Sequence, residues 1–311
     1  MGLDVERIGL VFPGQGAQSV GMGRWLAETY PVARELYHRA EEILGYDLAE
    51  LSFSGPAERL DATEFSQPAL FVSSMAAVAA LSQERPDLLS RVVAVAGLSL
   101  GEYSAVCFAG GLDFESALRL VQRRGQAMQA AADAADSGMA SIIGLDLDAV
   151  ERVCQQARQG DEVLVPANLL CRGNIAVSGH HSALRRVEQA ALDAGANKVI
   201  PLAVAGAFHT SLMLPAADLL AEALAGTDFR PLKFPVFSNV DAAPHTEATD
   251  FRELLARQLV GPVLWEKSVL AMVDAGIEGF LEVGTGRVLR GTIKRINRKL
   301  SVDGFGDGPP S

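Results

Sequence analysis

The stretch from Val92 to Ala105, VVAVAGLSLGEYSA, constrains the fold of this chain more than any other. It begins with a short apolar run that shows no polar alternation, which is typical of a parallel strand covered on both faces. Gly97 and Gly101 then bracket Ser99 in a G-x-S-x-G pattern. Because these two residues lack a Cβ, they permit a sharp turn from a strand into a helix. The stretch therefore predicts an α/β fold with a parallel sheet.

Ser99 is a candidate nucleophile because such a turn presents its hydroxyl at the tip. If a helix begins just after it, the free N–H of Leu100 and the positive end of the helix dipole face any oxyanion formed at the serine. The alternative is a glycine-rich turn with an ordinary serine, since short patterns also arise by chance. The pattern alone leaves both readings open.

Length and composition indicate a large globular protein. With 311 residues, the chain can form one large α/β domain, or a large domain that carries an insertion. The apolar stretches 69–81 and 92–112 are too short or contain a charge, so no membrane span is predicted, and no signal peptide is evident. The net charge of -11 argues against nucleic-acid binding.

The three cysteines are odd in number and lack CxxC spacing, which argues against a disulfide framework and a zinc site. We expect them to be reduced packing residues of a cytoplasmic protein that binds no metal. They are Cys107, Cys154 and Cys171.

A glycine-rich loop, PGQGAQSVGMG, follows a predicted strand at Ile8–Phe12. No Gly-Lys-Ser/Thr follows, so the loop is not a phosphate-binding P-loop. It offers the amides of Gln15 and Gln18 just beyond a strand end. Either could donate to an oxyanion or help to shape the loop. A helix is expected from near Trp25 to Leu44.

Two further helices are predicted before residue 138. The first is an apolar helix that begins at Gln67-Pro68 and runs through Leu81, and the second spans Phe114–Ala132. The second helix carries three arginines. Each would normally lie on a solvated face, but one that points into the pocket of Ser99 would grip a carboxylate through two parallel bonds. The three are Arg119, Arg123 and Arg124.

From Gly138 the pattern predicts elements in the order β-α-β-β-α-β, which is the ferredoxin-like arrangement. We expect residues 138–204 to form a small ferredoxin-like subdomain inserted into an α/β-hydrolase-like catalytic domain. That larger domain would comprise 1–137 and 205–302, with a parallel sheet. Residues 303–311, DGFGDGPPS, are expected to form a flexible tail.

Elimination among the five histidines selects His209. It lies in a loop of small and apolar residues just before a predicted helix, where a general base for Ser99 is expected. The alternative is a buried structural histidine. The other four occupy charged or boundary segments typical of the surface: His38, His180, His181 and His245.

Several motifs together resemble the malonyl-CoA:acyl carrier protein transacylases of fatty-acid synthesis and the related acyltransferases of polyketide synthases. They occur in the family's order over residues 8–297. They are FPGQGAQ with GMG, QPAL, GLSLGEYSA, VQRRGQAMQ, AFHTSLM, SNVD and EVGTGRVL.

The resemblance implies roles for several residues. Ser99 would be the nucleophile that accepts the acyl group from coenzyme A, and His209 the base that activates it. Gln15 would share the oxyanion hole with the N–H of Leu100. Kinetics would be ping-pong.

By the same resemblance, Arg124 would pair with the free carboxylate of a malonyl group. Gln258 would lie near His209, which amide and main-chain oxygens orient in this family rather than an aspartate. No acid falls at an obvious triad position in this sequence.

The resemblance implies that the chain transfers malonyl from malonyl-CoA to the phosphopantetheine thiol of an acyl carrier protein, free or within a polyketide synthase. We expect no permanently bound cofactor, no metal, no nucleic acid, no membrane and a monomer. The alternatives are an acyl hydrolase acting on carrier proteins, a transferase for a different extender unit, and a catalytically silent docking subunit.

The sequence departs from the family pattern at two places. Leu98 stands where the family usually has histidine, and Leu170 and Arg172 depart from the N-x-N-S-P run. Polar contacts there are therefore in doubt. An acidic carrier protein would need a local basic surface, and residues 294–299 offer either that surface or a solvated helix face.

Overall fold

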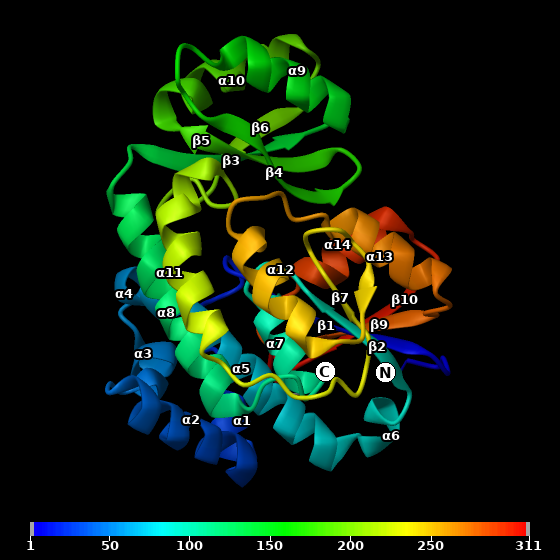
Figure 1. Cartoon of the computed structure of the whole chain (residues 1–311). Coiled ribbons are helices and arrows are strands. Elements are labelled where there is room, and N and C mark those ends of the chain that lie inside the picture. Colours follow the sequence, from blue (N-terminus) through cyan, green and yellow to red (C-terminus); the bar gives the residue numbers. More distant parts are fainter. Residues whose placement is uncertain (1–2, 309–311) are drawn as a thin grey trace.

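Two β-sheets organise the computed structural model, which describes residues 3–308 (Figure 1). The larger sheet has six strands in the order β10-β9-β1-β2-β7-β8. All its neighbouring pairs are parallel except β7 with β8. The smaller sheet has four strands in the order β4-β5-β3-β6, all antiparallel. The chain is thus a mixed α/β protein with one mainly parallel sheet, as predicted. The finer likeness to α/β-hydrolases and the domain boundaries remain predictions.

The larger sheet is buried on both faces, as the apolar runs predicted. Leu10 of β1 packs into the core on one face, and Val11 into the core on the other. Val95 of β2 pairs with Leu10. The strands are β1 Ile8–Phe12, β2 Val92–Gly97, β7 Val236–Phe237, β8 Pro244–His245, β9 Gly279–Val283 and β10 Ser301–Phe305.

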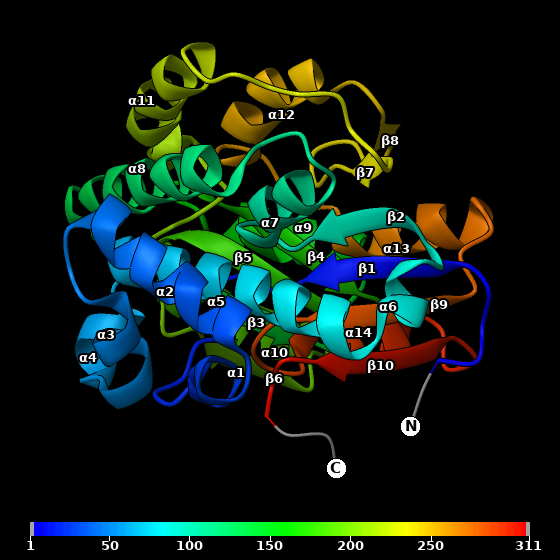
Figure 2. The same ribbon diagram turned by 90° about the horizontal axis from the view of Figure 1, so that it is seen from below.

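Helices cover both faces of this sheet (Figure 2). Helices α5 and α7 pack on the face that carries Leu10, and α13 and α14 on the face that carries Val11. The helices are α1 Arg24–Thr29, α2 Pro31–Leu44, α3 Leu48–Ser54, α4 Ala57–Asp61, α5 Thr63–Glu84, α6 Pro86–Leu89, α7 Gly101–Phe108, α8 Phe114–Asp133, α11 Leu214–Ala225, α12 Phe251–Gln258, α13 Trp265–Asp274 and α14 Val288–Ile296.

The smaller sheet and its two helices follow the order β-α-β-β-α-β and lie at the top of Figure 1. Side chains alternate along β5. Ile175 and Val177 join the core under the helices, whereas Ala176 joins the core of the larger unit. The elements are β3 Ser137–Ile143, α9 Leu147–Ala157, β4 Leu164–Cys171, β5 Asn174–His180, α10 His181–Asp193 and β6 Lys198–Pro201.

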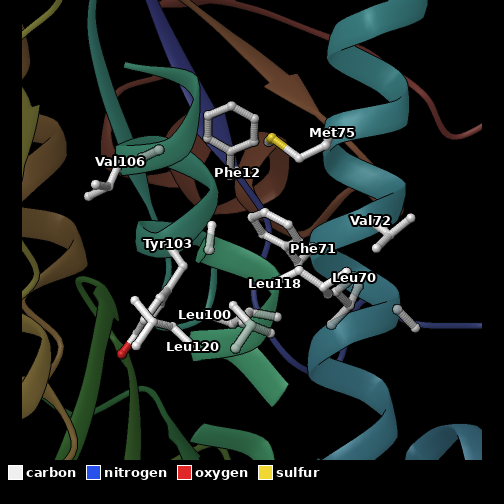
Figure 3. Close-up of a cluster of buried hydrophobic side chains, with 14 of the residues drawn as sticks. Phe12, Leu70, Phe71, Val72, Met75, Leu100, Tyr103, Val106, Leu118 and Leu120 are labelled. Carbon is white, nitrogen blue, oxygen red and sulfur yellow. The ribbon is translucent and has the colours of Figure 1, made fainter. Parts of the chain in front are cut away.

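Helix α7, which follows Ser99, is fixed by a dense apolar core (Figure 3). Leu100, Tyr103 and Val106 of this segment are buried in one cluster with Phe12 of β1 and Phe71 of α5. Fully burying one such side chain stabilises the fold by roughly 1.5–3 kcal/mol. The turn that carries Ser99 is therefore fixed by side chains of the hydrophobic core.

Two helix predictions differ from the structure. Helix α5 begins at Thr63 rather than at Gln67-Pro68, because the extended residue Ala62 starts it, and Pro68 lies inside the helix. The helix expected from Trp25 to Leu44 is divided into α1 and α2 by the extended backbone of Tyr30. Among residues 3–308, α5 alone is long and apolar enough to cross a membrane, and it is mostly buried inside the protein.

The flexible tail expected over 303–311 is wrong for residues 303–305. They belong to β10, which pairs in parallel with β9, so that Val302 lies opposite Phe280. The ring of Phe305 also contacts Trp25 edge-on. This segment continues the sheet rather than leaving it, and residues 309–311 lie outside the described residues.

Candidate active site

The turn between β2 and α7 has the expected form, for a reason that differs in part from the expected one. Ser99 itself is left-handed, with φ of 51°. A Cβ on Gly97 would lie 1.9 Å from the carbonyl carbon of Gly101, and a Cβ on Gly101 would lie 2.1 Å from the Phe12 oxygen. The two glycines are needed because neighbouring backbone segments approach them closely. The left-handed, strained conformation is adopted by Ser99 rather than by a glycine.

Ser99 and His209 are brought together although they are far apart in sequence. Ser99 Oγ lies 2.9 Å from His209 Nε2. His209 Nδ1 lies 2.7 Å from the main-chain oxygen of Gln258, which fixes the proton on Nδ1 and leaves Nε2 free to accept from the serine. His209 is buried and, like Ser99, left-handed, with φ of 62°.

The pKa of His209 is lowered from 6.5 to about 4, first by burial and second by the positive charge of Arg124. At neutral pH the imidazole is therefore uncharged. An uncharged imidazole whose Nε2 faces a serine hydroxyl can act as a general base.

The loop that carries His209 is anchored on the smaller sheet. Ser178 of β5 donates from its hydroxyl to the Phe208 oxygen at 2.7 Å. The hydroxyl of Ser137, on β3, accepts from the Ala207 N–H at 3.1 Å. The base is thus positioned by one sheet and the nucleophile by the other.

Arg124 is 1 % exposed and reaches the reacting serine from α8. Its Nη2 donates to Ser99 Oγ and to Gln258 Oε1, each at 2.9 Å, and its Nη1 donates to Gln67 Oε1 at 2.7 Å. The guanidinium also lies over the ring of Tyr103, 5.3 Å from the centroid. Every acceptor in this set is neutral, so the charge of Arg124 remains available to a carboxylate.

Of the three arginines on α8, only Arg124 lies at the serine. Arg119 is exposed and pairs with Glu115 at 3.0 Å, and Arg123 is exposed. The position of the guanidinium thus narrows the three candidates to one.

The predicted oxyanion donors are placed less directly. Gln15 donates from Nε2 to Thr63 Oγ1 at 3.3 Å, and no hydrogen bond joins its side chain to Ser99 within the described residues. The loop itself touches the turn, because a Cβ on Gly14 would lie 2.3 Å from the Leu98 oxygen. Leu100 is the N-cap of α7, so its N–H lies before the first helical hydrogen bonds.

Two residues that sequence reasoning missed support the serine. Asn239 accepts the Ser99 N–H on Oδ1 at 2.6 Å and donates from Nδ2 to the Gly97 oxygen at 2.7 Å. Glu102 accepts from Gln258 Nε2 at 2.6 Å. Both belong to motifs that carried the family resemblance, SNVD and GLSLGEYSA, and this was the available signal.

Leu98, which stands where a histidine was expected, is 8 % exposed. Its side chain joins the core that lies between the larger sheet and α13. Its N–H donates to the Phe12 oxygen at 3.1 Å. The residue therefore links the turn to β1. In residues 3–308, no group of three or more metal-binding side chains is arranged to hold an ion.

Comparison with known proteins gives a consistent result. A family model described as an acyl transferase domain matches residues 10–301. The chain is 41% identical to the malonyl CoA-acyl carrier protein transacylase of Escherichia coli strain K12, over 97% of both chains. It is similar to that of Coxiella burnetii, with a TM-score of 0.91, 38% identity and coverage of 97% and 94%.

A third relative is the malonyl-transacylase solved in complex with its type II PKS acyl-carrier protein. That comparison gives a TM-score of 0.92 with 39% identity, and it covers 97% of this chain and 96% of that one.

Proposed function

The chain belongs to the acyl transferase domain family, and from this membership we propose that it moves a malonyl group from malonyl-CoA to the phosphopantetheine thiol of an acyl carrier protein. One observation carries the proposal. Ser99 Oγ lies 2.9 Å from an uncharged histidine and 2.9 Å from the guanidinium of Arg124. A nucleophile with a base on one side and a buried cation on the other suits an acyl group that ends in a carboxylate.

In the first half-reaction His209 Nε2 takes the proton of Ser99 while Oγ attacks the thioester carbon of malonyl-CoA. The tetrahedral oxyanion would be held by the N–H of Leu100 together with Gln15. The carbon–sulfur bond then breaks, and coenzyme A leaves with the proton from His209. A malonyl ester remains on Ser99.

In the second half-reaction the phosphopantetheine thiol gives its proton to His209, and its sulfur attacks the ester carbon. Ser99 leaves and regains the proton. Throughout, Arg124 would hold the malonyl carboxylate, and Gln258 would support His209 through its main-chain oxygen. No resident cofactor enters either step.

Arg124 also supports transfer of an acid-bearing group over hydrolysis of general acyl groups. A hydrolase for neutral acyl chains gains nothing from a buried guanidinium, whose desolvation is costly. A substrate carboxylate that pairs with the guanidinium would offset this desolvation cost.

The proposal includes the surroundings of the reaction. The partner would be an acyl carrier protein, which would approach a basic surface at 294–299, and the enzyme would act as a cytoplasmic monomer. The catalytic domain would be α/β-hydrolase-like, with residues 138–204 as its ferredoxin-like subdomain.

Brief exposure to malonyl-CoA, followed by intact-mass measurement, tests the proposal. We expect a malonyl adduct that is absent from Ser99→Ala and that passes to added holo carrier protein. Free malonate without malonyl-carrier would indicate a hydrolase instead. An unlabelled protein would indicate a catalytically silent subunit.

A further inference from the structure

Glu102 is a buried carboxyl group that the proposed reaction does not use. It lies in the first turn of α7 and is 0% exposed. Its Oε2 accepts from Gln258 Nε2 at 2.6 Å and from the Asn239 N–H at 3.2 Å. Its Oε1 has no partner among the described residues. A buried carboxyl group is costly, so the presence of Glu102 at this place needs an explanation.

Each of the two donors also holds Ser99. Asn239 Oδ1 accepts the Ser99 N–H at 2.6 Å, and Gln258 Nε2 donates to the Ser99 oxygen at 3.0 Å. These two bonds grip both sides of a residue whose φ is 51°. A non-glycine residue keeps such a conformation only where its surroundings fix it. Glu102 accepts a hydrogen bond from each of the two residues that hold Ser99, Asn239 and Gln258.

Glu102 also determines which way the Gln258 amide faces. The NH₂ group points at the Glu102 carboxyl, and Oε1 accepts from Arg124 Nη2 at 2.9 Å. The reversed amide would place its oxygen against the carboxyl and its NH₂ against the guanidinium. Both contacts would be repulsive, so a carboxyl and a cation on opposite sides permit one orientation.

We propose that Glu102 is a positioning residue for Ser99 acylation: by accepting from Gln258 and Asn239 on one oxygen, it keeps Ser99, His209 and Arg124 in line. It touches no reacting atom and acts through the two residues that do the holding. The inference rests on the proposed function, because the reaction measured is acylation of Ser99.

The pKa of Glu102 is raised to about 7, chiefly by burial, and this rise is opposed by hydrogen bonds to the carboxyl group, first that from Gln258, and by the charge of Arg124. The charged and titratable groups that act on it are Arg124 of α8 and Tyr103 of α7. Protonation at the unpartnered Oε1 would leave both hydrogen bonds to Oε2 in place. The positioning role therefore does not depend on the charge of Glu102.

Three substitutions test the role. Glu102→Leu removes the acceptor at similar volume, Glu102→Asp withdraws it by one methylene, and Glu102→Gln keeps an acceptor oxygen in place. The matched controls are Glu222→Leu and Glu222→Gln, on an exposed position of α11. Single-turnover acylation of Ser99 is followed by intact mass with malonyl-CoA and, separately, with acetyl-CoA, per mole of folded protein.

We expect E102L and E102D to acylate about 10- to 100-fold more slowly with both thioesters, with KM changed less than about threefold, because misalignment costs rate rather than binding. E102Q should stay within about fivefold of the wild type, which is rescue by the conservative variant. Both Glu222 variants should match the wild type.

Folded E102L or E102D that acylates at the wild-type rate would overturn the inference, as would E102Q as slow as E102L. If E102L does not fold, the comparison of E102D with E102Q decides alone. Failure of the proposed function looks different, because the wild-type chain itself would then carry no malonyl group on Ser99 or would pass none to the carrier protein.

Discussion

At the scale of single residues, the centre of the site is one serine oxygen shared between a base and a cation. His209 Nε2 and Arg124 Nη2 each lie 2.9 Å from Ser99 Oγ. In the proposed reaction, His209 takes the proton of Ser99 and Arg124 pairs with the carboxylate of the acyl group. The two contacts can therefore be separated by substitution.

Arg124→Ala should slow transfer from malonyl-CoA and raise the relative rate with acetyl-CoA. Loss of a charged hydrogen-bonded contact in a buried site costs about 1.5–3 kcal/mol, or roughly ten- to a hundredfold in selectivity. The ratio of the two kcat/KM values is the measurement, with exposed Arg123→Ala as the matched control. An unchanged ratio would place the carboxylate contact elsewhere.

Glu102 and His209, two buried titratable groups of the site, should have opposite effects on how the free energy of unfolding depends on pH. Burial raises the pKa of Glu102 from 4.5 to about 7, so the folded form keeps a proton that the unfolded form loses, and the free energy of unfolding falls as pH rises through this window. The pKa of His209 is lowered from 6.5 to about 4, so the free energy of unfolding rises with pH between those values. The two trends largely cancel between pH 4.5 and 6.5.

Glu102→Gln removes the first trend and leaves the second. The free energy of unfolding of E102Q relative to the wild type should therefore increase from pH 4.5 to 7, by at most about 1.4 kcal/mol per pH unit. Urea unfolding at several pH values measures it. A difference that does not change with pH would show that Glu102 does not titrate in this window.

Ser99 could be predicted from a local pattern, and His209 by elimination, because both signals lie within a few residues of the group concerned. Glu102 could not. An acid in the first turn of a helix is common and stabilising in any helix. Its partners lie 137 and 156 residues away, and only the folded sheet brings them to it.

At the scale of elements, the turn between β2 and α7 depends on two backbones that touch. A Cβ on Gly101 would meet the Phe12 oxygen at 2.1 Å, whereas a Cβ on Gly291 in α14 would meet nothing within 4 Å. Both glycines are helical, so they differ in contact rather than in local conformation.

Gly101→Ala should therefore lower the free energy of unfolding by several kcal/mol and slow Ser99 acylation, because α7 must move away from β1. Gly291→Ala should be neutral, or stabilising by up to about 1 kcal/mol, since alanine favours helix. Chemical unfolding and single-turnover acylation compare the pair. Equal effects at the two sites would contradict the close-contact explanation.

Sequence patterns predicted elements best where burial is regular, periodic along α8 and continuous along β1 and β2. They failed at β10, because its glycine- and aspartate-rich sequence resembles a loop. That segment is a strand because β9 offers an open edge, a property of the neighbour rather than of the segment. The start of α5 was predicted too late, at Gln67-Pro68, because the extended residue Ala62 that precedes the helix left no sequence signal.

At the scale of the whole molecule, the two sheets meet at the loops that carry Ser99 and His209. Besides Ser137 and Ser178, β4 joins the loop after α12, where the Val263 N–H donates to Ala167 at 2.8 Å and the Leu169 N–H donates to Val263 at 2.9 Å. The smaller sheet therefore borders both His209 and the segment beyond Gln258.

Ser178→Ala tests this coupling. It leaves the buried Phe208 oxygen without its partner, so we expect roughly tenfold slower acylation and about 1–3 kcal/mol lower stability. Ser141→Ala is the control, because that hydroxyl donates at 2.7 Å to Asn174 within the same sheet, away from the His209 loop. The acylation rate of Ser141→Ala should stay normal. An equal loss of rate in both variants would show that Ser178 acts only through general stability of the smaller sheet.

The serine anchors on the smaller sheet also decide how enzymes of this kind can be recombined. A graft that replaces residues 138–204 alone separates Ser178 from the Phe208 carbonyl that it was matched to. The exchangeable unit runs from Ser137 through His209, so that the sheet travels with the loop it supports. A designer who wants to alter selectivity by swapping parts should cut outside that span, because inside it the His209 loop and the sheet that anchors it are inherited together.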